Sequence, residues 1–310
     1  MVQELSDLHI HTDMPITMRL NGELISCNDS LIKKNDINEF IDIFLTESQK
    51  IELEENKQID LALNIKNYRF RVNFFYNNKG KALALRIINS AIPSFKELNI
   101  PYIVYENALQ KNGLILITGP TGSGKSTSLA SVIDKLNAET RKNIITIEDP
   151  IEFLYQNKQS VISQREIGRD AISFSNALRA ALRQDPEIIM VGELRDPESI
   201  SLALTAAETG HIVFGTLHTN SAPDTINRII DAFPAGQQNQ IRSQLSQCLR
   251  LVMTQQLIKV PGLTKRLGIF EIMICNNPVS NLIRENKVFQ IQNVMETSMQ
   301  SGMITMEKAL

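Results

Sequence analysis

The fold of this chain is decided by Ile115-Leu-Ile-Thr-Gly119-Pro-Thr-Gly-Ser-Gly124-Lys125-Ser126-Thr127. The stretch starts as an apolar run typical of a buried strand, continues as a glycine-rich turn, and leads into a helix predicted over Ser128–Leu136. Gly119, Gly124, Lys125 and Ser126 fill the pattern G-x-x-x-x-G-K-[ST]. Because the pattern binds phosphate in this strand–turn–helix setting, we interpret the stretch as a P-loop rather than a chance glycine turn.

The P-loop predicts binding of ATP together with Mg²⁺. Its glycines let backbone N–H groups surround an anion, and the helix that follows points its N-terminus at the same place. Lys125 is expected to reach the β- and γ-phosphates, and Ser126 is expected to ligate Mg²⁺. The residues expected to bind the nucleotide are Gly119, Pro120, Thr121, Gly122, Ser123, Gly124, Lys125, Ser126 and Thr127.

Short apolar runs alternate with helical segments from about residue 101 onward, which predicts a parallel sheet covered by helices on both faces. These runs are Leu114–Thr118, Asn143–Ile147, Glu187–Val191 and Ile212–Thr216. One helix between them has a clear start, with Asp196 as the capping residue and Pro197 at the first helical position. Two further strands are expected at Met253–Val260 and Arg266–Ile274, followed by a helical tail from about residue 278.

Residues 1–90 are predicted to form a separate small α/β domain. A helix is expected over Asn35–Phe44, with Asn35 or Asp36 as its N-cap. The expected strands are Asp7–His11, Pro15–Gly22, Ile59–Ile65, Tyr68–Tyr76 and Lys81–Ile88. Prolines and polar residues then interrupt both periodicities from Asn89 to Pro101, so we place an interdomain linker at 91–101 and a second domain at 102–310.

Composition limits the class of protein. The chain has 310 residues, 43% hydrophobic and 21% charged, which is ordinary for a globular protein of one or two domains. Its net charge of −2 and the lack of an apolar stretch near the roughly 20 residues of a membrane span argue against a nucleic-acid partner and direct membrane insertion. Cys27, Cys248 and Cys275 are far apart, which favours thiols in a reducing cytoplasm over disulfides or a zinc site.

Two acidic segments follow predicted strands and are candidates for the catalytic site. Glu193 comes after an apolar strand and a turn at Gly192, where open parallel sheets place their ligands. A carboxylate there can orient or deprotonate an attacking water, although an ordinary exposed glutamate would fit the same pattern. Glu148 ends the preceding strand and is followed by Asp149 and Glu152, a set that suits either a Mg²⁺–water shell or a solvated turn.

Two histidines border another predicted strand. His218 lies at its carboxyl end and His211 at its start. Because His218 should share a sheet edge with the nucleotide, we predict that it senses the γ-phosphate, while a structural role stays open for both. No third residue has the spacing of a metal ligand, so a metal site at these histidines is not expected.

Arginines gather on adjacent predicted strands of the first domain. Arg69 and Arg71 share one face by the period of two, and Arg86 lies on the neighbouring strand. On composition alone, a solvated sheet face explains them better than a binding role.

Four ordered segments together resemble the secretion ATPase superfamily. Gly119–Ser126, Ile145–Glu152, Asp185–Glu193 and Gly210–Thr219 are similar to its Walker A, Asp box, Walker B and His box. A narrower resemblance, to the PilT type of retraction ATPases of type IV pili, rests on Ser6–His9, Arg69–Asn73, Gln164–Gly168 and Asn281–Glu285. The resemblance covers nearly the whole chain, and four boxes in order are more specific than any one alone.

This resemblance implies an α/β protein with a PAS-like domain, a RecA-like ATPase domain and a homohexameric ring. It implies Mg²⁺-dependent ATP hydrolysis by a cytoplasmic motor, peripheral at the inner face of the cytoplasmic membrane and docked on the pilus platform protein, that powers pilus retraction in twitching motility. Glu193 would be the catalytic glutamate, Glu148 the acid of the Asp box, and Arg71 and Arg86 the arginines that reach a phosphate. Pro278-Val-Ser280 departs from the Ala-Ile-Arg that usually precedes the retraction segment.

Other functions are weaker interpretations of the same sequence. A RecA-like DNA translocase would need a basic pore with aromatic stacking residues, and the chain has no Trp and a net charge of −2. A regulatory P-loop protein that only binds nucleotide would lack a carboxylate such as Glu193. A pilus extension or type II secretion ATPase would usually add a long N-terminal region and a four-cysteine zinc site, and neither is present in this sequence.

Overall fold

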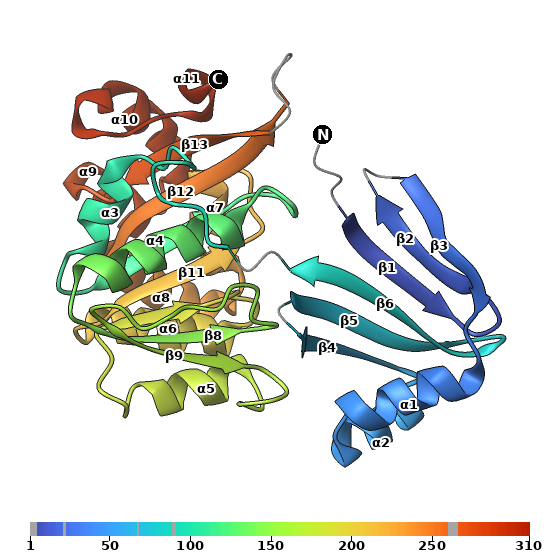
Figure 1. Cartoon of the computed structure of the whole chain (residues 1–310). Helices are drawn as coiled ribbons and strands as arrows, with labels where there is room; N and C mark the ends of the chain where they lie inside the picture. Colours follow the sequence, from blue (N-terminus) through green and yellow to red (C-terminus); the bar gives the residue numbers. More distant parts are fainter. Residues whose placement is uncertain (1–4, 21–22, 67, 89–90, 260–265) are drawn as a thin grey trace. The chain divides into compact units, whose positions relative to one another are not determined.

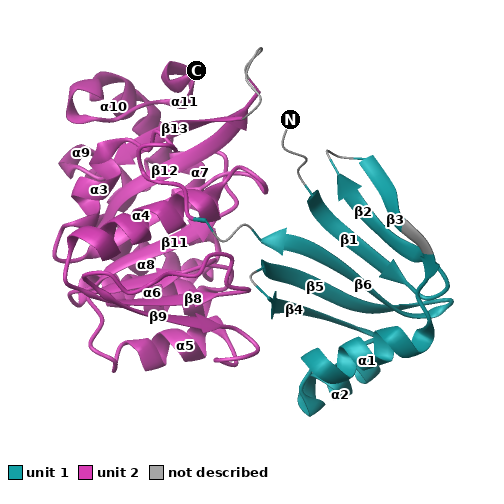
Figure 2. Cartoon of the chain, in the orientation of Figure 1, with its two compact units in different colours: residues 1–91 teal, residues 92–310 magenta. Residues whose placement is uncertain are grey.

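The computed structural model describes residues 5–20, 23–66, 68–88, 91–259 and 266–310 and divides into two compact units, Met1–Ala91 and Ile92–Leu310 (Figures 1 and 2). The strand ends expected at Asn21-Gly22 and at Val260, and Asn89-Ser90 of the predicted break, lie outside the described residues. The predicted α/β fold is confirmed: one unit holds an antiparallel sheet and the other a mainly parallel sheet.

Unit 1 is a six-stranded antiparallel sheet in the order β3-β2-β1-β6-β5-β4. Its strands are β1 Leu5–His11, β2 Pro15–Leu20, β3 Glu23–Leu31, β4 Gln58–Ile65, β5 Tyr68–Asn77 and β6 Gly80–Ile88. Helices α1 Lys34–Phe44 and α2 Glu47–Asn56 supply Ile37, Ile41 and Leu53 to one core with Val72, Phe74 and Leu83 from the sheet. Since side chains alternate along a strand, the two helices cover one face of this sheet.

Three features of unit 1 differ from the sequence expectations. Strand β3 was not predicted because its apolar residues are interrupted by polar ones, and helix α2 was not predicted because it buries only Leu53. The N-cap of α1 is Lys33, not Asn35 or Asp36. Asp36 instead sits at the third helical position, where its carboxylate accepts the Lys33 backbone N–H at 2.8 Å.

Unit 2 contains a seven-stranded sheet in the order β13-β12-β7-β11-β10-β8-β9, in which only β13 runs antiparallel to its neighbour. The strands are β7 Gly113–Thr118, β8 Asn143–Glu148, β9 Val161–Glu166, β10 Ile188–Val191, β11 Ile212–Leu217, β12 Leu249–Ile258 and β13 Leu267–Ile274. All residues of β7, β10 and β11 are buried, as predicted for strands covered on both faces.

Helices cover both faces of this sheet. Ile115 and Ile117 of β7 pack into one core with α3 Tyr102–Ala108 and α4 Lys125–Glu139. Leu114 and Leu116 pack into the other core with α5 Phe174–Ala181, α6 Pro197–Glu208, α7 Ala222–Asp231, α8 Ala235–Cys248 and α9 Asn277–Arg284. The chain continues through η1 Val288–Gln290, α10 Ile291–Thr297, η2 Met299–Ser301 and α11 Met306–Ala309.

The parallel strands follow the predicted runs, with two differences. Strand β9 was not expected, because Val161–Glu166 has only one buried residue and lies at the sheet edge. Strand β12 begins at Leu249, four residues before the expected start. The start of α6 is confirmed, since Asp196 Oδ1 accepts the Ser199 backbone N–H at 2.8 Å. Part of the stretch predicted as a linker, Phe95 to Ile100, packs onto a core of unit 2.

Candidate functional site

The candidate site lies at the carboxyl ends of four adjacent parallel strands. Strands β7, β11, β10 and β8 are neighbours in that order, and Thr118 lies opposite Leu217 while Val191 lies opposite Gly215 and Ile147. The predicted P-loop, His218, Glu193 and Glu148 follow or end these four strands. Open parallel sheets bind ligands at this edge, so the sheet topology alone brings the four segments to one place.

The P-loop closes so tightly that its first glycine has no room for a side chain. Gly119 has φ 141°, and a Cβ there would lie 2.3 Å from the backbone oxygen of Gln255 and 2.7 Å from Ser123 Oγ. Gly124 takes the left-handed conformation as N-cap of α4 and offers no side-chain cap. The first N–H groups of α4 therefore stay available to an anion, which is the property that a phosphate site needs.

Lys125 lies across this loop. Its Nζ donates to the carbonyl oxygens of Gly119 and Pro120 at 2.8 and 3.0 Å. Burial lowers the pKa of Lys125, while the negative fields of Glu193 and Glu152 oppose that change. A desolvated ammonium over a phosphate-sized loop, with two carboxylates nearby, suits contact with the β- and γ-phosphates.

His218 connects the P-loop to Glu193 through its two ring nitrogens. Its Nδ1 lies 3.4 Å from Lys125 Nζ and 3.5 Å from Thr121 Oγ1, and its Nε2 lies 3.5 Å from Glu193 Oε1. Because the Lys125 ammonium can only donate, Nδ1 is the accepting nitrogen and Nε2 carries the hydrogen toward Glu193. His211 is not part of this group, since its Nδ1 lies 3.0 Å from the backbone oxygen of Ala206.

Glu193 is held by an arginine that the sequence analysis did not single out. Arg195 Nη2 lies 2.8 Å from Glu193 Oε2, and Arg195 Nη1 lies 3.6 Å from Asp149 Oδ2. The same carboxylate faces His218 with its other oxygen, so both oxygens of Glu193 are oriented. In the sequence, Arg195 follows Glu193 by two residues, but this spacing alone does not indicate that the two side chains are in contact.

Glu148 is buried, and its side-chain hydrogen bonds go to residues outside this group. Its Oε1 accepts hydrogen bonds from Thr146 Oγ1 at 2.7 Å and Gln164 Nε2 at 3.1 Å, and the side chain is 9% exposed. Burial raises the pKa of Glu148 to about 7, with the field of Glu152 adding to the rise. Of Glu148 and Glu152, it is Glu152 whose negative field acts on Lys125. The sequence alone left a functional role for Glu152 open.

Magnesium would have few protein ligands here. Ser126 is the second residue of α4, directly after Lys125. Within the described part of the chain, no group of three or more His, Cys, Asp and Glu side chains could hold a metal ion. The residues fit Mg²⁺ nonetheless, because this ion is usually bound by one or two protein oxygens together with water and substrate phosphates.

Two buried polar atoms beside the P-loop have no partner. These are Ser123 Oγ and Gln255 Oε1. Gln255 lies on β12 beneath the loop, since a Cβ on Gly124 would stand 3.0 Å from its Nε2. Buried polar groups are almost always hydrogen-bonded, so these atoms indicate a place where a polar ligand or water completes the site. Nothing in the sequence pattern indicated Gln255.

Arg71 and Arg86 lie on neighbouring strands of the antiparallel sheet of unit 1. They stand opposite one another in the β5–β6 ladder, and Arg86 stands opposite Asp7 of β1. Arg86 Nε lies 2.8 Å from Asp7 Oδ1, and Arg71 Nε lies 3.8 Å from Asp60 Oδ1. Burial would raise the pKa of Asp7, but hydrogen bonds from Arg86 and Ser6 outweigh it and lower that pKa. Both arginines stay exposed, and their contact with a nucleotide remains a prediction.

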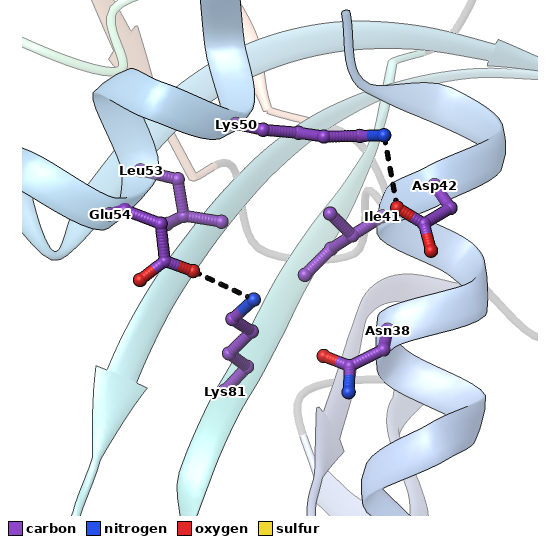
Figure 3. A pocket seen from close by; sticks show the side chains of 7 residues that line it. All are labelled: Asn38, Ile41, Asp42, Lys50, Leu53, Glu54 and Lys81. Carbon is purple, nitrogen blue, oxygen red and sulfur yellow. Dashed lines mark ion pairs between the residues drawn. The ribbon is translucent and has the colours of Figure 1, made fainter. Parts of the chain in front are cut away.

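A second concave site occurs in unit 1, between α1, α2 and β6 (Figure 3). This cavity of about 340 Å³ has Ile41 and Leu53 at its base. Its two cations are already paired: Lys50 Nζ lies 3.0 Å from Asp42 Oδ1, and Lys81 Nζ lies 2.9 Å from Glu54 Oε1. Because both cations are paired with carboxylates of the same cavity, we assign the chemistry to the sheet edge of unit 2.

Over the described ranges, no helix is both long and apolar enough to cross a membrane.

Comparisons with known proteins identify the family of this chain. The family model described as type II/IV secretion system protein matches residues 1–262. A twitching motility protein of Neisseria gonorrhoeae is 45% identical over 294 residues, covering 94% of this chain and 79% of that protein. The type IV pilus retraction ATPase PilT of Pseudomonas aeruginosa is 43% identical over 309 residues, covering 99% of this chain and 90% of that protein. A crystal structure of the pilus retraction motor PilT with bound ADP superimposes with a TM-score of 0.89 at 44% identity, covering 99% and 92% of the two chains.

Proposed function

The chain belongs to the type II/IV secretion system protein family of ATPases, and we propose that it is a motor that hydrolyses ATP with Mg²⁺ to retract type IV pili. The observation that carries the proposal is the placement of Lys125, His218 and Glu193 in one connected group at the strand ends. A group of this kind can bind a triphosphate, detect its terminal phosphate and orient a water molecule. The likeness to PilT over nearly the whole chain supplies the retraction role.

Nucleotide binding is assigned to the P-loop. Backbone N–H groups of 121–127, which include the start of α4, surround the phosphates, and Ser123 supplies an unpaired hydroxyl beside them. Lys125 exchanges the carbonyls of Gly119 and Pro120 for the β- and γ-phosphate oxygens. Ser126 would hold Mg²⁺, which neutralises charge on the phosphates during hydrolysis.

Hydrolysis is assigned to Glu193. Its carboxylate orients the attacking water and accepts a proton from it, while Arg195 holds the carboxylate in place. His218 touches both the phosphate-binding Lys125 and Glu193, so it can report the presence of the γ-phosphate to the catalytic carboxylate. Arg71 and Arg86 would neutralise charge in the transition state, as arginines of another domain or subunit do in many P-loop ATPases.

The assembly that we propose is a homohexamer in the cytoplasm, bound to the pilus platform protein at the inner face of the cytoplasmic membrane. Residues 1–90 form its PAS-like domain and 102–310 its RecA-like domain, and Phe95 to Ile100 of the stretch predicted as a linker pack with the second of these. A ring is supported by the placement of Arg71 and Arg86 in a separate compact unit, because arginines on a separate unit can serve a neighbouring subunit's nucleotide.

The deciding experiment removes the gene and counts surface pili. Cells without a retraction motor should carry more pili than wild type and lose twitching, and the gene encoding Glu193→Gln should not restore motility. Cells that instead lose their pili would contradict retraction and support the alternative of an extension ATPase. Phosphate release by the purified protein with and without Mg²⁺ tests the enzymatic half of the proposal separately.

A further inference from the structure

Glu271 is a buried carboxylate that the proposed reaction does not use. It lies in β13 with 3% of its surface exposed. Its Oε1 accepts the backbone N–H of Ala222 at 2.7 Å, and its Oε2 accepts that of Met306 at 3.3 Å. Burial raises the pKa of Glu271, and these two N–H groups oppose the rise because they stabilise the charged form. A buried acid that serves two backbone donors from distant segments fixes those segments to its strand.

One of the two segments is the start of α7. Ala222 is the first residue of this helix, whose first N–H groups have no partner within the helix. The Ser221 side chain accepts the Asp224 N–H, whereas Glu271 accepts the N–H of Ala222, so the two side chains satisfy different donors of the first turn. A negative charge at a helix N-terminus is favourable as well. Glu271 therefore fixes the first residue of α7 to β13.

Helix α7 in turn holds the loop that carries His218. Four residues, 218–221, connect the end of β11 to the start of α7. Thr225 of α7 is fully buried, and its Oγ1 lies 2.6 Å from Thr219 Oγ1 and donates to the Ser221 oxygen at 2.7 Å. Since Thr219 is the chain neighbour of His218, this contact restrains the backbone that carries the imidazole.

On its other side, Glu271 is linked to the strand of the P-loop. Thr254 of β12 lies opposite both Glu271 and Thr118, and Thr118 Oγ1 lies 2.9 Å from Thr254 Oγ1. Thr118 and Thr254 are completely buried, and Thr118 directly precedes Gly119. A polar row across three strands thus connects the base of the P-loop to the helix that positions His218.

We propose that Glu271 is a positioning residue of the ATPase site, which fixes His218 relative to the P-loop by holding α7 against the β12–β13 strands. The inference rests on the proposed role of His218 in hydrolysis. It assigns to Glu271 no contact with nucleotide, so its loss should slow turnover without weakening ATP binding.

Glu271→Gln is the main test, because it keeps the shape and leaves one acceptor oxygen for two backbone donors. In the full-length assembly we expect kcat for ATP hydrolysis to fall about 10-fold, the scale of a small misplacement, with KM for ATP within about 2-fold of wild type. Glu307→Gln, which removes an exposed carboxylate one residue after Met306, is the matched control and should leave both unchanged.

A double-mutant cycle separates positioning from general damage. In a His218→Gln background, Glu271→Gln should reduce kcat by less than about 2-fold, because the group through which it acts is already gone. Equal fold losses in both backgrounds would overturn the inference, as would an unchanged kcat in the single variant. If wild type hydrolyses ATP and His218→Gln is impaired while Glu271→Gln is not, the proposed function stands and this inference fails.

Two further variants separate the contact of Glu271 with α11 from its contact with α7. Met306→Pro deletes the second N–H donor at a first-turn position where proline fits, after a residue in extended conformation. Compared with Met306→Ala, it should keep kcat, because α11 does not carry His218. Should Glu271→Gln fail to fold, Thr225→Val decides: a lower kcat at constant KM supports the positioning route, and an unchanged kcat refutes it.

Discussion

The two sheets of this protein place their candidate functional residues in different ways. In the parallel sheet of unit 2, strands β7, β10 and β11 are entirely buried, and the chemistry gathers where they end. In the antiparallel sheet of unit 1, β1 and β2 are only half-buried. Arg71 and Arg86 lie within β5 and β6, opposite one another on the same face of the sheet. Unit 2 can therefore assemble a site by topology alone, whereas the role proposed for the arginines of unit 1 requires another body to meet their face.

The largest expected effect tests the strand-end site. Glu193→Gln should keep ATP binding and lower kcat by about 10²–10⁴, the usual contribution of a positioned general base. Glu198→Gln, at an exposed residue in the first turn of α6 that pairs with Arg179, is the control and should hydrolyse ATP normally. Lys125→Ala should differ from both by weakening nucleotide binding itself. Steady-state phosphate release measures kcat, and a nucleotide titration measures binding. Normal phosphate release by folded Glu193→Gln would show that Glu193 is not the catalytic carboxylate.

The next prediction concerns the neighbouring strand end, where Glu148 is buried without a cation. Its pKa is about 7 in the folded chain, against 4.5 for an ordinary glutamate. Between these values the folded protein keeps a proton that the unfolded chain releases, so rising pH lowers the free energy of unfolding, by up to about 3 kcal/mol in all. Glu148→Gln removes this loss while its oxygen still accepts from Thr146 and Gln164. It should therefore be more stable than wild type at pH 8 but not at pH 4.

Urea unfolding of wild type and Glu148→Gln at several pH values between 4 and 8 checks this prediction. The same measurement on Glu307→Gln, which replaces an exposed acid near the C-terminus, serves as the control. A stability difference that stays constant across the range would show that Glu148 does not titrate as its burial requires.

The face of unit 1 is tested by replacing its arginines one at a time. Arg71→Ala or Arg86→Ala should reduce hydrolysis by about 10²-fold, less than the 10³–10⁵ of a lone arginine finger because the other arginine remains. ATP affinity should change less than kcat. Arg19→Ala is a matched control, since Arg19 also lies near Asp7, at 3.9 Å, on the adjacent strand. Full activity of a monomer in sedimentation experiments would contradict action across subunits.

The smallest effect on hydrolysis is expected in α9, whose residues are not part of the strand-end site. Ile283 is buried in α9, whereas Arg284 is exposed and donates only to Asn281 Oδ1, at 3.2 Å, among its described contacts. Arg284→Ala and Leu282→Ala should leave ATPase activity and hexamer formation within about 2-fold of wild type. If this segment couples ATP hydrolysis to movement, retraction is nevertheless lost and surface pili accumulate. A proportional fall in ATPase activity and retraction would make the segment structural only.

The same contrast explains what could be predicted from the sequence. The P-loop, Glu193 and His218 were placed correctly at one sheet edge because consecutive parallel strands present their carboxyl ends together. Side-chain contacts across the edge were not accessible in this way. The bond of Arg195 to Glu193 depends on the direction of a loop, and the buried position of Glu148 depends on Gln164 of a strand that was not predicted.

The residues least visible in the sequence were those whose role comes from strand pairing. Glu271 and Gln255 became notable only when β12 was seen between β7 and β13. Their neighbours along the chain resemble any other buried strand, so no local pattern separates them from core residues. Long-range register was the missing information, as it also was for edge strands β3 and β9.

Finally, the shape of the P-loop bears on how freely its sequence can drift during evolution. A side chain at Gly119 meets a backbone oxygen at 2.3 Å that cannot move without displacing β12, whereas a Cβ at Gly122 would find no atom within 4 Å. Gly122 is free of such a contact, and asparagine tolerates its φ of 77° better than most residues. Aspartate tolerates the same φ but would bring a negative charge to a loop that we propose binds phosphate. In a library of variants selected for motility, position 119 should therefore stay invariant while position 122 admits asparagine.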